Sequence, residues 1–141
     1  MKSEVFLDSV YAIALSAASD EHHHRALDLA KRLKAAGTRF VTTHAILLEI
    51  GNTLAKARYR RAAVALLRSL IADPFVEIVA LTPELFSRAF RLYADRMDKQ
   101  WGLTDCVSFV VMRNRGITEA LTADEHFRQA GFVALRAETS Q

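Results

Sequence analysis

Short apolar segments alternate with longer amphipathic segments along the whole chain, and this alternation constrains the fold more than any other feature. The apolar segments have the composition of buried strands and span residues 5–7, 40–42, 77–81, 120–122 and 133–135. Between them apolar residues recur at the helical spacing, as at Ala26, Leu29, Ala30 and Leu33. Strands that alternate with helices are typical of an α/β fold with a mainly parallel sheet, and nearly all-apolar strands indicate helices on both faces. The sequence thus predicts a three-layer α/β/α fold with about five strands.

Capping residues and turn residues set the expected limits of the helices. Asp20, Thr82 and Thr104 are predicted N-caps, while Gly37 and Gly116 are predicted to end their helices. The expected helical segments are 10–17, 20–37, 44–58, 61–72, 83–97, 104–115 and a short turn at 125–129.

Length and composition narrow the class of protein. A chain of 141 residues suits one domain, and 51% apolar with 25% charged residues excludes an intrinsically disordered chain. The single cysteine, Cys106, excludes an intramolecular disulfide. No run approaches the ~18 apolar residues that a membrane span needs. We therefore expect one cytoplasmic domain over residues 1–141, and its net charge of +3 permits a polyanionic partner without requiring one.

Four acidic residues occupy notable places in this pattern. Asp8 and Asp124 follow predicted strands, Asp105 opens a predicted helix, and Glu49 lies in the apolar stretch 45–50. Each also suits a plain structural role, because aspartate is common in turns and caps and glutamate forms helices well. In a parallel sheet, however, the residues that follow the strands gather at one edge, which is where ligands bind.

The set of carboxylates suggests a metal site. Several carboxylates gathered at one edge would repel one another unless a divalent cation lay between them. Ligand sets made only of oxygen atoms suit hard ions such as Mg²⁺ or Mn²⁺, which also bind phosphate. The sequence therefore suggests a carboxylate metal site, with the number of ions left open.

Four ordered motifs also carry a resemblance to a known family. They are Val-Phe-Leu-Asp-Ser at 5–9, Leu-Glu at 48–49, Leu-Thr-Asp-Cys-Val-Ser-Phe at 103–109 and the segment Leu-Thr-Ala-Asp-Glu-His-Phe-Arg-Gln-Ala-Gly-Phe at 121–132. In order and spacing they resemble the motifs of the PIN-domain family, above all its VapC-type toxins of toxin–antitoxin pairs. The resemblance spans almost the whole chain.

This resemblance implies an activity and a set of site residues. The family's acidic quartet, which binds Mg²⁺ or Mn²⁺ and cleaves RNA, matches four residues here: Asp8, Glu49, Asp105 and Asp124. The three aspartates would hold the metal, and Glu49 would orient the attacking water. Ser9 and Thr104 match hydroxyl positions beside the first and third aspartate. A hydrolytic route of this kind gives 5′-phosphate products.

Basic and apolar residues outside the quartet suggest partners. The densest basic run comprises Lys56, Arg58, Arg60 and Arg61, which could contact the RNA backbone or an antitoxin, or form a solvated face. His126 lies two residues after Asp124, where it could contact RNA or pack as a turn residue. The resemblance further implies a homodimer and capture by a cognate antitoxin. Eight apolar residues are candidates for such contacts: Leu47, Leu54, Leu66, Leu67, Leu70, Phe86, Phe90 and Tyr93.

Other functions stay open at this point. A PIN-fold nuclease of RNA processing that is not a toxin would carry the same quartet. A noncatalytic module that binds nucleic acid or protein would keep the fold without needing the quartet. Phosphoryl-transfer enzymes with strand-end aspartates usually carry a second acidic residue near the first, and Asp8-Ser9-Val10 lacks one.

Overall fold

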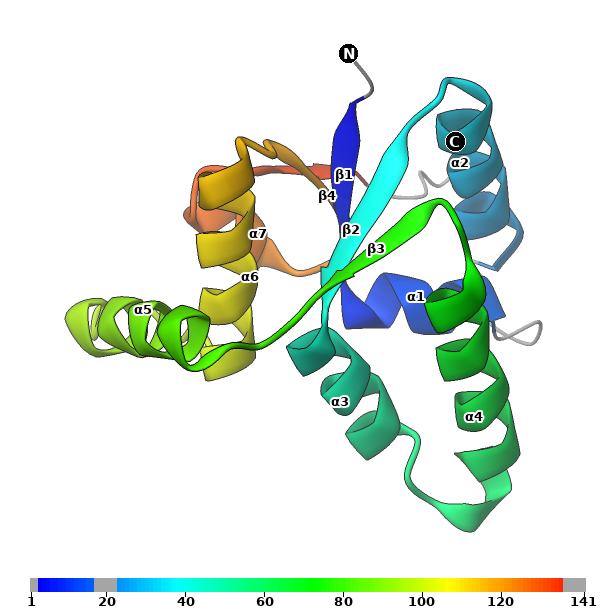
Figure 1. Ribbon diagram of the computed structural model, residues 1–141, viewed down its shortest axis with the longest axis horizontal. Helices are drawn as coiled ribbons and strands as arrows, with labels where there is room; N and C mark the ends of the chain where they lie inside the picture. Colours follow the sequence, from blue (N-terminus) through cyan, green and yellow to red (C-terminus); the bar gives the residue numbers. More distant parts are fainter. Residues whose placement is uncertain (1–2, 17–22, 136–141) are drawn as a thin grey trace.

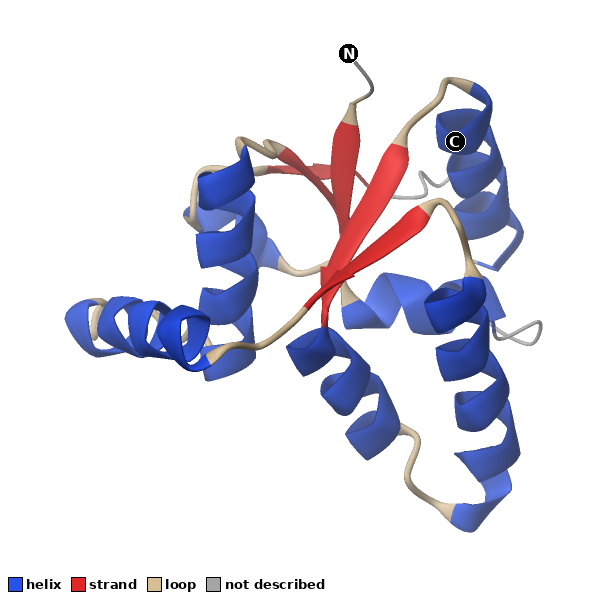
Figure 2. Ribbon diagram, in the orientation of Figure 1, coloured by secondary structure: helices blue, strands red, loops and turns tan. Residues whose placement is uncertain are grey.

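The computed structural model of the protein describes residues 3–16 and 23–135. Its centre is a sheet of five strands, all paired in parallel, in the order β3-β2-β1-β4-β5 (Figure 2). The strands are β1 (Glu4–Leu7), β2 (Arg39–Thr43), β3 (Val76–Val79), β4 (Glu119–Leu121) and β5 (Val133–Leu135). All five predicted strands are present. β3 ends before the predicted residue 81, because Val79 already pairs with Thr43, the last residue of β2.

Helices cover both faces of this sheet, as predicted. They are α1 (Ser9–Ser16), α2 (His23–Ala35), α3 (His44–Thr53), α4 (Ala57–Ala72), α5 (Pro83–Asp95), α6 (Leu103–Arg115) and α7 (Glu125–Gln129). Figure 1 shows α5 and α6 on one side of the sheet and α1, α2 and α4 on the other. The predicted three-layer α/β/α fold is therefore confirmed. No helix among residues 3–16 and 23–135 is long and apolar enough to cross a membrane.

Several helix ends differ from the predicted ones, and one predicted N-cap lies outside the described residues. α4 begins at Ala57 instead of residue 61, and α5 ends at Asp95 instead of residue 97. α3 ends at Thr53 instead of residue 58, and Lys56 has an extended backbone (φ −62°, ψ 146°) that begins α4 at Ala57. The predicted N-cap at Thr104 is wrong, because α6 begins at Leu103 with Gly102 as its N-cap. The N-cap predicted at Asp20 falls in the segment that the structure does not describe.

Glycine ends two helices where only a left-handed backbone continues the chain. Gly37 and Gly116 have φ angles of 83° and 69°, a region that side-chain-bearing residues rarely adopt. Both were predicted to end their helices. The turn at Gly116 leads directly into Ile117 and β4, so it fixes the direction in which the chain returns to the sheet.

The core is apolar and continuous, and it fixes α6 and α7 relative to the sheet. Residues 106–112 of α6 are all buried, so this helix has its central turns enclosed on every side. The ring of Phe109 packs edge-on against Trp101 at 5.0 Å and against Phe127 at 5.1 Å between centroids. Trp101 also donates a hydrogen bond from Nε1 to Gln129 (3.1 Å). These contacts hold the start of α6 close to α7, which matters for the site below.

Arg115 links α6 to two strands, and its loss should lower stability. Its guanidinium donates to both carboxylate oxygens of Glu4 (2.7 and 3.3 Å) and both of Glu77 (2.7 and 2.9 Å). Bidentate pairs are the stronger kind of ion pair, although partial exposure screens them. We expect Arg115→Gln to reduce the free energy of unfolding by about 1–2 kcal/mol in urea titrations.

Arg113 provides the matched control for this change. It lies in the same last turn of α6 and is exposed, so Arg113→Gln removes the same charge near the same helix end. We expect it to change stability by less than about 0.5 kcal/mol. Equal losses in the two variants would contradict a specific role of the Glu4–Arg115–Glu77 cluster.

Candidate active site

The site lies where the order of the strands reverses. The chain leaves β1 toward β2 on one side, while β4 lies on the other side of β1. At such a reversal the carboxyl ends of parallel strands leave a crevice in which ligands bind. Asp8 follows β1 directly, and its backbone N–H donates to the carbonyl of Leu121 at the end of β4 (3.1 Å). Thr42 also holds the end of β1 in place, because its hydroxyl donates to the carbonyl of Leu7 (2.9 Å).

Asp8 is a buried carboxylate with two neutral donors. Its side chain belongs to a residue only 4% exposed. Oδ1 accepts the N–H of Ser9 (2.8 Å), and Oδ2 accepts the hydroxyl of Thr122 (2.7 Å). Burial raises the pKa of Asp8 to about 6, and the nearby charges of Glu49 and Asp105 add to the rise, against the lowering effect of the two hydrogen bonds. A cation at this position would therefore relieve an unfavourable negative charge.

Glu49 faces Asp8 from α3. The Ser9 hydroxyl donates to Glu49 Oε1, so Ser9 connects the two carboxylates, one through its backbone and one through its side chain. Although the sequence around Glu49 is apolar, Leu48 is 62% exposed while Ile46 and Ile50 are buried. The Glu49 carboxylate is half-buried, so it borders the site instead of lying inside the core.

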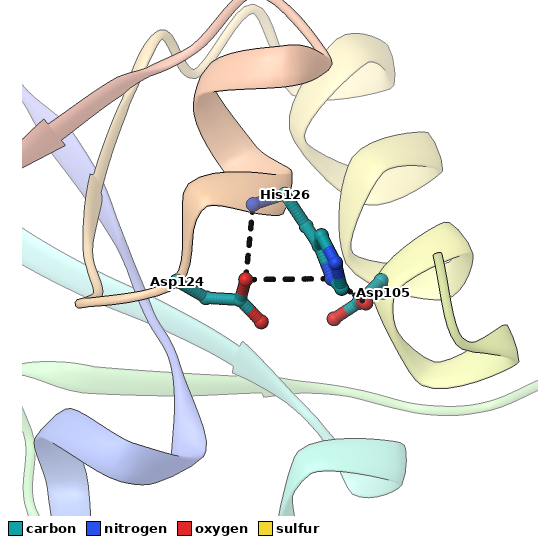
Figure 3. A group of neighbouring side chains, drawn as sticks. All are labelled: Asp105, Asp124 and His126. Atoms are coloured by element: carbon teal, nitrogen blue, oxygen red, sulfur yellow. Dashed lines mark hydrogen bonds and ion pairs between the residues drawn. The ribbon is translucent and has the colours of Figure 1, made fainter. Parts of the chain in front are cut away.

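Asp105, Asp124 and His126 meet on the other side of the site (Figure 3). Nδ1 of His126 lies 2.9 Å from Asp105 Oδ2 and 3.3 Å from Asp124 Oδ1. Both aspartates also serve their helices. Asp124 accepts the N–H of His126 (2.9 Å) as the N-cap of α7, and Asp105 accepts the N–H of Gly102 (3.1 Å) at the start of α6. The capping role and the site role therefore coincide in the same side chains.

A single hydrogen-bonded network joins all four acidic side chains. Thr122 closes it, because its hydroxyl donates to Asp8 and accepts the N–H of Asp124 (3.0 Å). In order, the network runs through Glu49, Ser9, Asp8, Thr122, Asp124, His126 and Asp105. Its members come from α1, α3, α6, α7 and the ends of β1 and β4, so only the folded chain assembles it. We call these seven residues the acidic network.

Three side chains of the acidic network offer ligand atoms that suit a divalent cation. One carboxylate oxygen each from Asp105 and Asp124 and one ring nitrogen of His126 lie within 4.8 Å of one another. Two ligand atoms that each lie about 2.1 Å from the same ion are at most about 4.2 Å apart. Small movements of these three side chains would therefore bring their ligand atoms to the distances that an ion requires. The raised pKa of the buried Asp8 points to the same need for positive charge.

The structure separates the other predicted residues from the network or gives them different roles. The Thr104 hydroxyl makes no hydrogen bond to the acidic side chains within the described residues, and Thr104 contributes only its carbonyl, to Ser108 (3.2 Å). Cys106 is buried, and burial raises the pKa of its thiol to about 11, which makes it a poor nucleophile. Thr122 was missed in the sequence, although a hydroxyl two residues before a strand-end aspartate is a usable signal.

The fold and this site define a class of protein. The sequence profile of the PIN domain family matches residues 5–133, and the chain belongs to that family. The chain is 32% identical over 135 residues to the 23S rRNA-specific endonuclease VapC20 of Mycobacterium tuberculosis, and the match covers 95% of this chain and 99% of that protein. The resemblance to VapC-type toxins is thereby confirmed.

Solved structures agree with this assignment. The crystal structure of Mycobacterium tuberculosis VapC20, a sarcin–ricin loop cleaving toxin, matches with a TM-score of 0.79 and 30% identity over 93% of this chain and 98% of that one. VapBC2 from Rickettsia felis, bound to a DNA fragment from its promoter, matches with a TM-score of 0.67 at 11% identity over 94% of this chain and 98% of that one. FitAcB from Neisseria gonorrhoeae matches with a TM-score of 0.65 at 14% identity over 94% and 97%. The last two show the fold alone.

Proposed function

We propose that this protein is a metal-dependent endoribonuclease that hydrolyses RNA phosphodiester bonds and acts as the toxin of a type II toxin–antitoxin pair. The observation that carries the proposal is the acidic network, which brings four carboxylates from separate elements to the strand-order reversal. A noncatalytic module would have no need to bury Asp8 beside Glu49 and Asp105 at the cost of a raised pKa. Membership of the PIN domain family supports the nuclease reading.

Six of the seven members of the network have a role in this proposal. Asp8, Asp105 and Asp124 supply the carboxylate oxygens that hold Mg²⁺ or Mn²⁺. When bound, the ion supplies positive charge at the phosphate and acidifies the attacking water. Glu49 orients that water through a carboxylate oxygen, and Ser9 holds Glu49 in place by its hydroxyl hydrogen bond. Thr122 fixes Asp8 and the backbone of Asp124 relative to each other.

The relatives suggest the class of RNA. VapC20 is described as specific for 23S rRNA and as a sarcin–ricin loop cleaving toxin. At 32% identity over nearly the full length of both chains, we propose a structured ribosomal RNA loop as substrate. With Mn²⁺ or Mg²⁺ we expect purified protein to cut ribosomes at a discrete site and to leave 5′-phosphate and 3′-hydroxyl ends, as sequencing of the RNA ends would show.

Removal of the metal tests the mechanism directly. We expect a chelator to reduce cleavage by at least about 10³-fold, since the ion contributes several kcal/mol of charge stabilisation. Returning Mn²⁺ in excess should restore the rate. Undiminished cleavage in chelator, or products that end in a 2′,3′-cyclic phosphate, would contradict the proposal. Cleavage without growth arrest on expression would instead favour a processing nuclease that is not a toxin.

The proposal includes a cytoplasmic homodimer and an antitoxin partner. Among the apolar residues singled out in the sequence, Leu66 and Leu70 belong to the core, whereas Phe86, Phe90 and Tyr93 of α5 are exposed. The rings of Phe86 and Phe90 stack at 6.4 Å between centroids with an interplanar angle of 7°. Such an aromatic face on one helix suits burial against another protein surface.

The basic run lies at the N-terminus of α4, where positive charge interacts unfavourably with the helix dipole. Lys56 is the N-cap, Arg58, Arg60 and Arg61 lie in the first turns, and all four side chains are exposed. Cations near a helix N-terminus are disfavoured by the helix dipole, so helix stability does not explain Lys56, Arg58 and Arg61. Arg60 has a structural contact as well, since its guanidinium donates to the carbonyl of Ala55 (2.7 Å). Figure 1 places this α3–α4 turn at the tip of an arm that projects from the sheet. We propose that the basic run contacts the RNA backbone or the antitoxin.

Charge reversal in the basic run tests this contact. We expect the double variant Arg58→Glu and Arg61→Glu to raise KM by about tenfold at 0.1 M salt with little change in kcat, and to flatten the dependence of KM on salt. Its melting temperature should stay the same or rise, because anions favour a helix N-terminus. Steady-state kinetics over a salt series and thermal denaturation give both readouts.

An equal change of charge elsewhere serves as the control. Arg88 and Arg91 on α5 are exposed and have the same spacing, so Arg88→Glu with Arg91→Glu alters net charge identically. This control should change KM much less. Equal effects of the two double variants would assign the basic run to general electrostatics, not to a contact.

A further inference from the structure

The side chain of His126 lies between two carboxylates, a position that packing within α7 alone would not require. It is the second residue of α7, and its own N–H is held by Asp124 Oδ1 at 2.9 Å. Its side chain is 28% exposed, and Nδ1 faces Asp105 Oδ2 and Asp124 Oδ1 together (Figure 3). The ring is therefore fixed from its backbone and directed into the acidic network.

Both carboxylate oxygens that face Nδ1 already accept a backbone N–H, Asp124 Oδ1 from His126 and Asp105 Oδ2 from Gly102, so neither depends on the ring for a hydrogen bond. Nδ1 carries at most one proton, and a neutral imidazole with its proton on Nε2 offers a lone pair at Nδ1 instead. A cation placed among the three side chains, by contrast, would interact with both carboxylate oxygens and with that lone pair. The three atoms already lie within 4.8 Å of one another.

We infer that His126 is a nitrogen ligand of the divalent ion and biases the site toward transition ions such as Mn²⁺ over Mg²⁺. Mg²⁺ takes oxygen ligands almost exclusively and holds its waters tightly, whereas imidazole nitrogen binds transition ions well. The three aspartates alone would form an oxygen site that accepts either ion. The inference rests on the metal-dependent activity proposed above, and it adds which ion the chain selects and by which atom.

Replacement of His126 by asparagine separates a ligand from a hydrogen-bond partner. The Asn amide can still donate a hydrogen bond toward Asp105 and offers an oxygen to hard ions, but it carries no imidazole nitrogen. We expect His126→Asn to weaken Mn²⁺ binding by about tenfold or more and Mg²⁺ binding by less than about twofold. Titration calorimetry with Mn²⁺, and Mg²⁺ competition against bound Mn²⁺, measure the two affinities on the metal-free protein.

Electron spin echo spectroscopy of bound Mn²⁺ gives a direct readout on the unmodified protein. Coupling to a histidine ¹⁴N should be present in the unmodified chain and absent in His126→Asn. The matched control is His24→Asn, which removes an exposed histidine of α2 outside the acidic network and should keep both the coupling and the ion preference.

The outcomes distinguish this inference from the function on which it rests. Mn²⁺ binding without ¹⁴N coupling in the unmodified protein would overturn the inference and leave the metal-dependent nuclease intact. Equal loss of Mn²⁺ and Mg²⁺ affinity in His126→Asn would reduce His126 to a positioning residue and overturn it as well. If the unmodified chain bound neither ion, the proposed metal dependence would fail too.

Discussion

Asp8→Asn is expected to abolish RNA cleavage while making the metal-free protein more resistant to unfolding at neutral pH. The loss of activity follows from the place of Asp8 at the centre of the acidic network, between Ser9 and Thr122. Removing one carboxylate of a metal site forfeits several kcal/mol of charge stabilisation, which corresponds to at least about 10³ in rate.

The gain in stability follows from the pKa of Asp8. In the folded protein this pKa is raised from 3.8 to about 6, so the native state holds its proton more tightly than the unfolded chain does. Stability from this group is fully present below pH 3.8 and declines as the pH rises to about 6, where the native carboxyl ionises. Above that pH the buried charge costs up to ~3 kcal/mol, which an uncharged asparagine does not incur.

Urea unfolding across pH in chelator measures this effect. The difference between Asp8→Asn and the unmodified protein should be largest above pH 6 and should nearly vanish near pH 4. Asp28→Asn, a change of the same charge on an exposed residue of α2, should show neither effect. If the stability difference between Asp8→Asn and the unmodified protein were the same at pH 7 as at pH 4, or if the variant kept full activity, the role assigned to Asp8 would be wrong.

The fold could be predicted from the sequence because its signals are local. Strands such as 5–7 are continuous apolar runs, and Pro83 after Thr82 marks a helix start that the structure places at the same residue. The end of α3 could not be read in this way. Residues 54–58 contain no proline or glycine, and the break depends on the backbone of Leu54 and Lys56 in the folded chain.

The residues of the site likewise divide into those with a local signal in the sequence and those without one. Asp8 and Asp124 were found because both follow strands, and parallel strands bring their ends together. Thr122 and His126 act through contacts over 114 and 21 positions of sequence, to Asp8 and Asp105 respectively. The spacing of residues in the sequence does not predict which hydroxyl or ring will contact a carboxylate that lies so far away along the chain. Thr104, which stands beside Asp105 in the sequence, illustrates the converse, since adjacency did not bring its hydroxyl to the network.

Thr122→Val is expected to reduce cleavage by about 10–100-fold and to move the acidic limb of the pH–rate profile to higher pH. Thr122 is fully buried, and valine has nearly its shape but no hydroxyl. Without that hydroxyl Asp8 loses a donor that now lowers its pKa, so the pKa rises above about 6 and more alkaline buffer is needed to ionise it. The N–H of Asp124 also loses its acceptor, which loosens the start of α7.

Two companion variants make this result specific. Thr42→Val removes an equally buried hydroxyl, whose partner is the Leu7 carbonyl, so it should cost about 1–3 kcal/mol of stability without moving the pH limb. Thr122→Ser keeps the hydroxyl and should restore both the rate and the pH profile. Single-turnover cleavage from pH 5 to 9 at a fixed, subsaturating Mn²⁺ concentration, where protons and the ion compete for Asp8, provides the comparison. Because a merely structural role would affect both threonines alike, an unshifted limb in Thr122→Val would show that the hydroxyl does not tune the charge of Asp8.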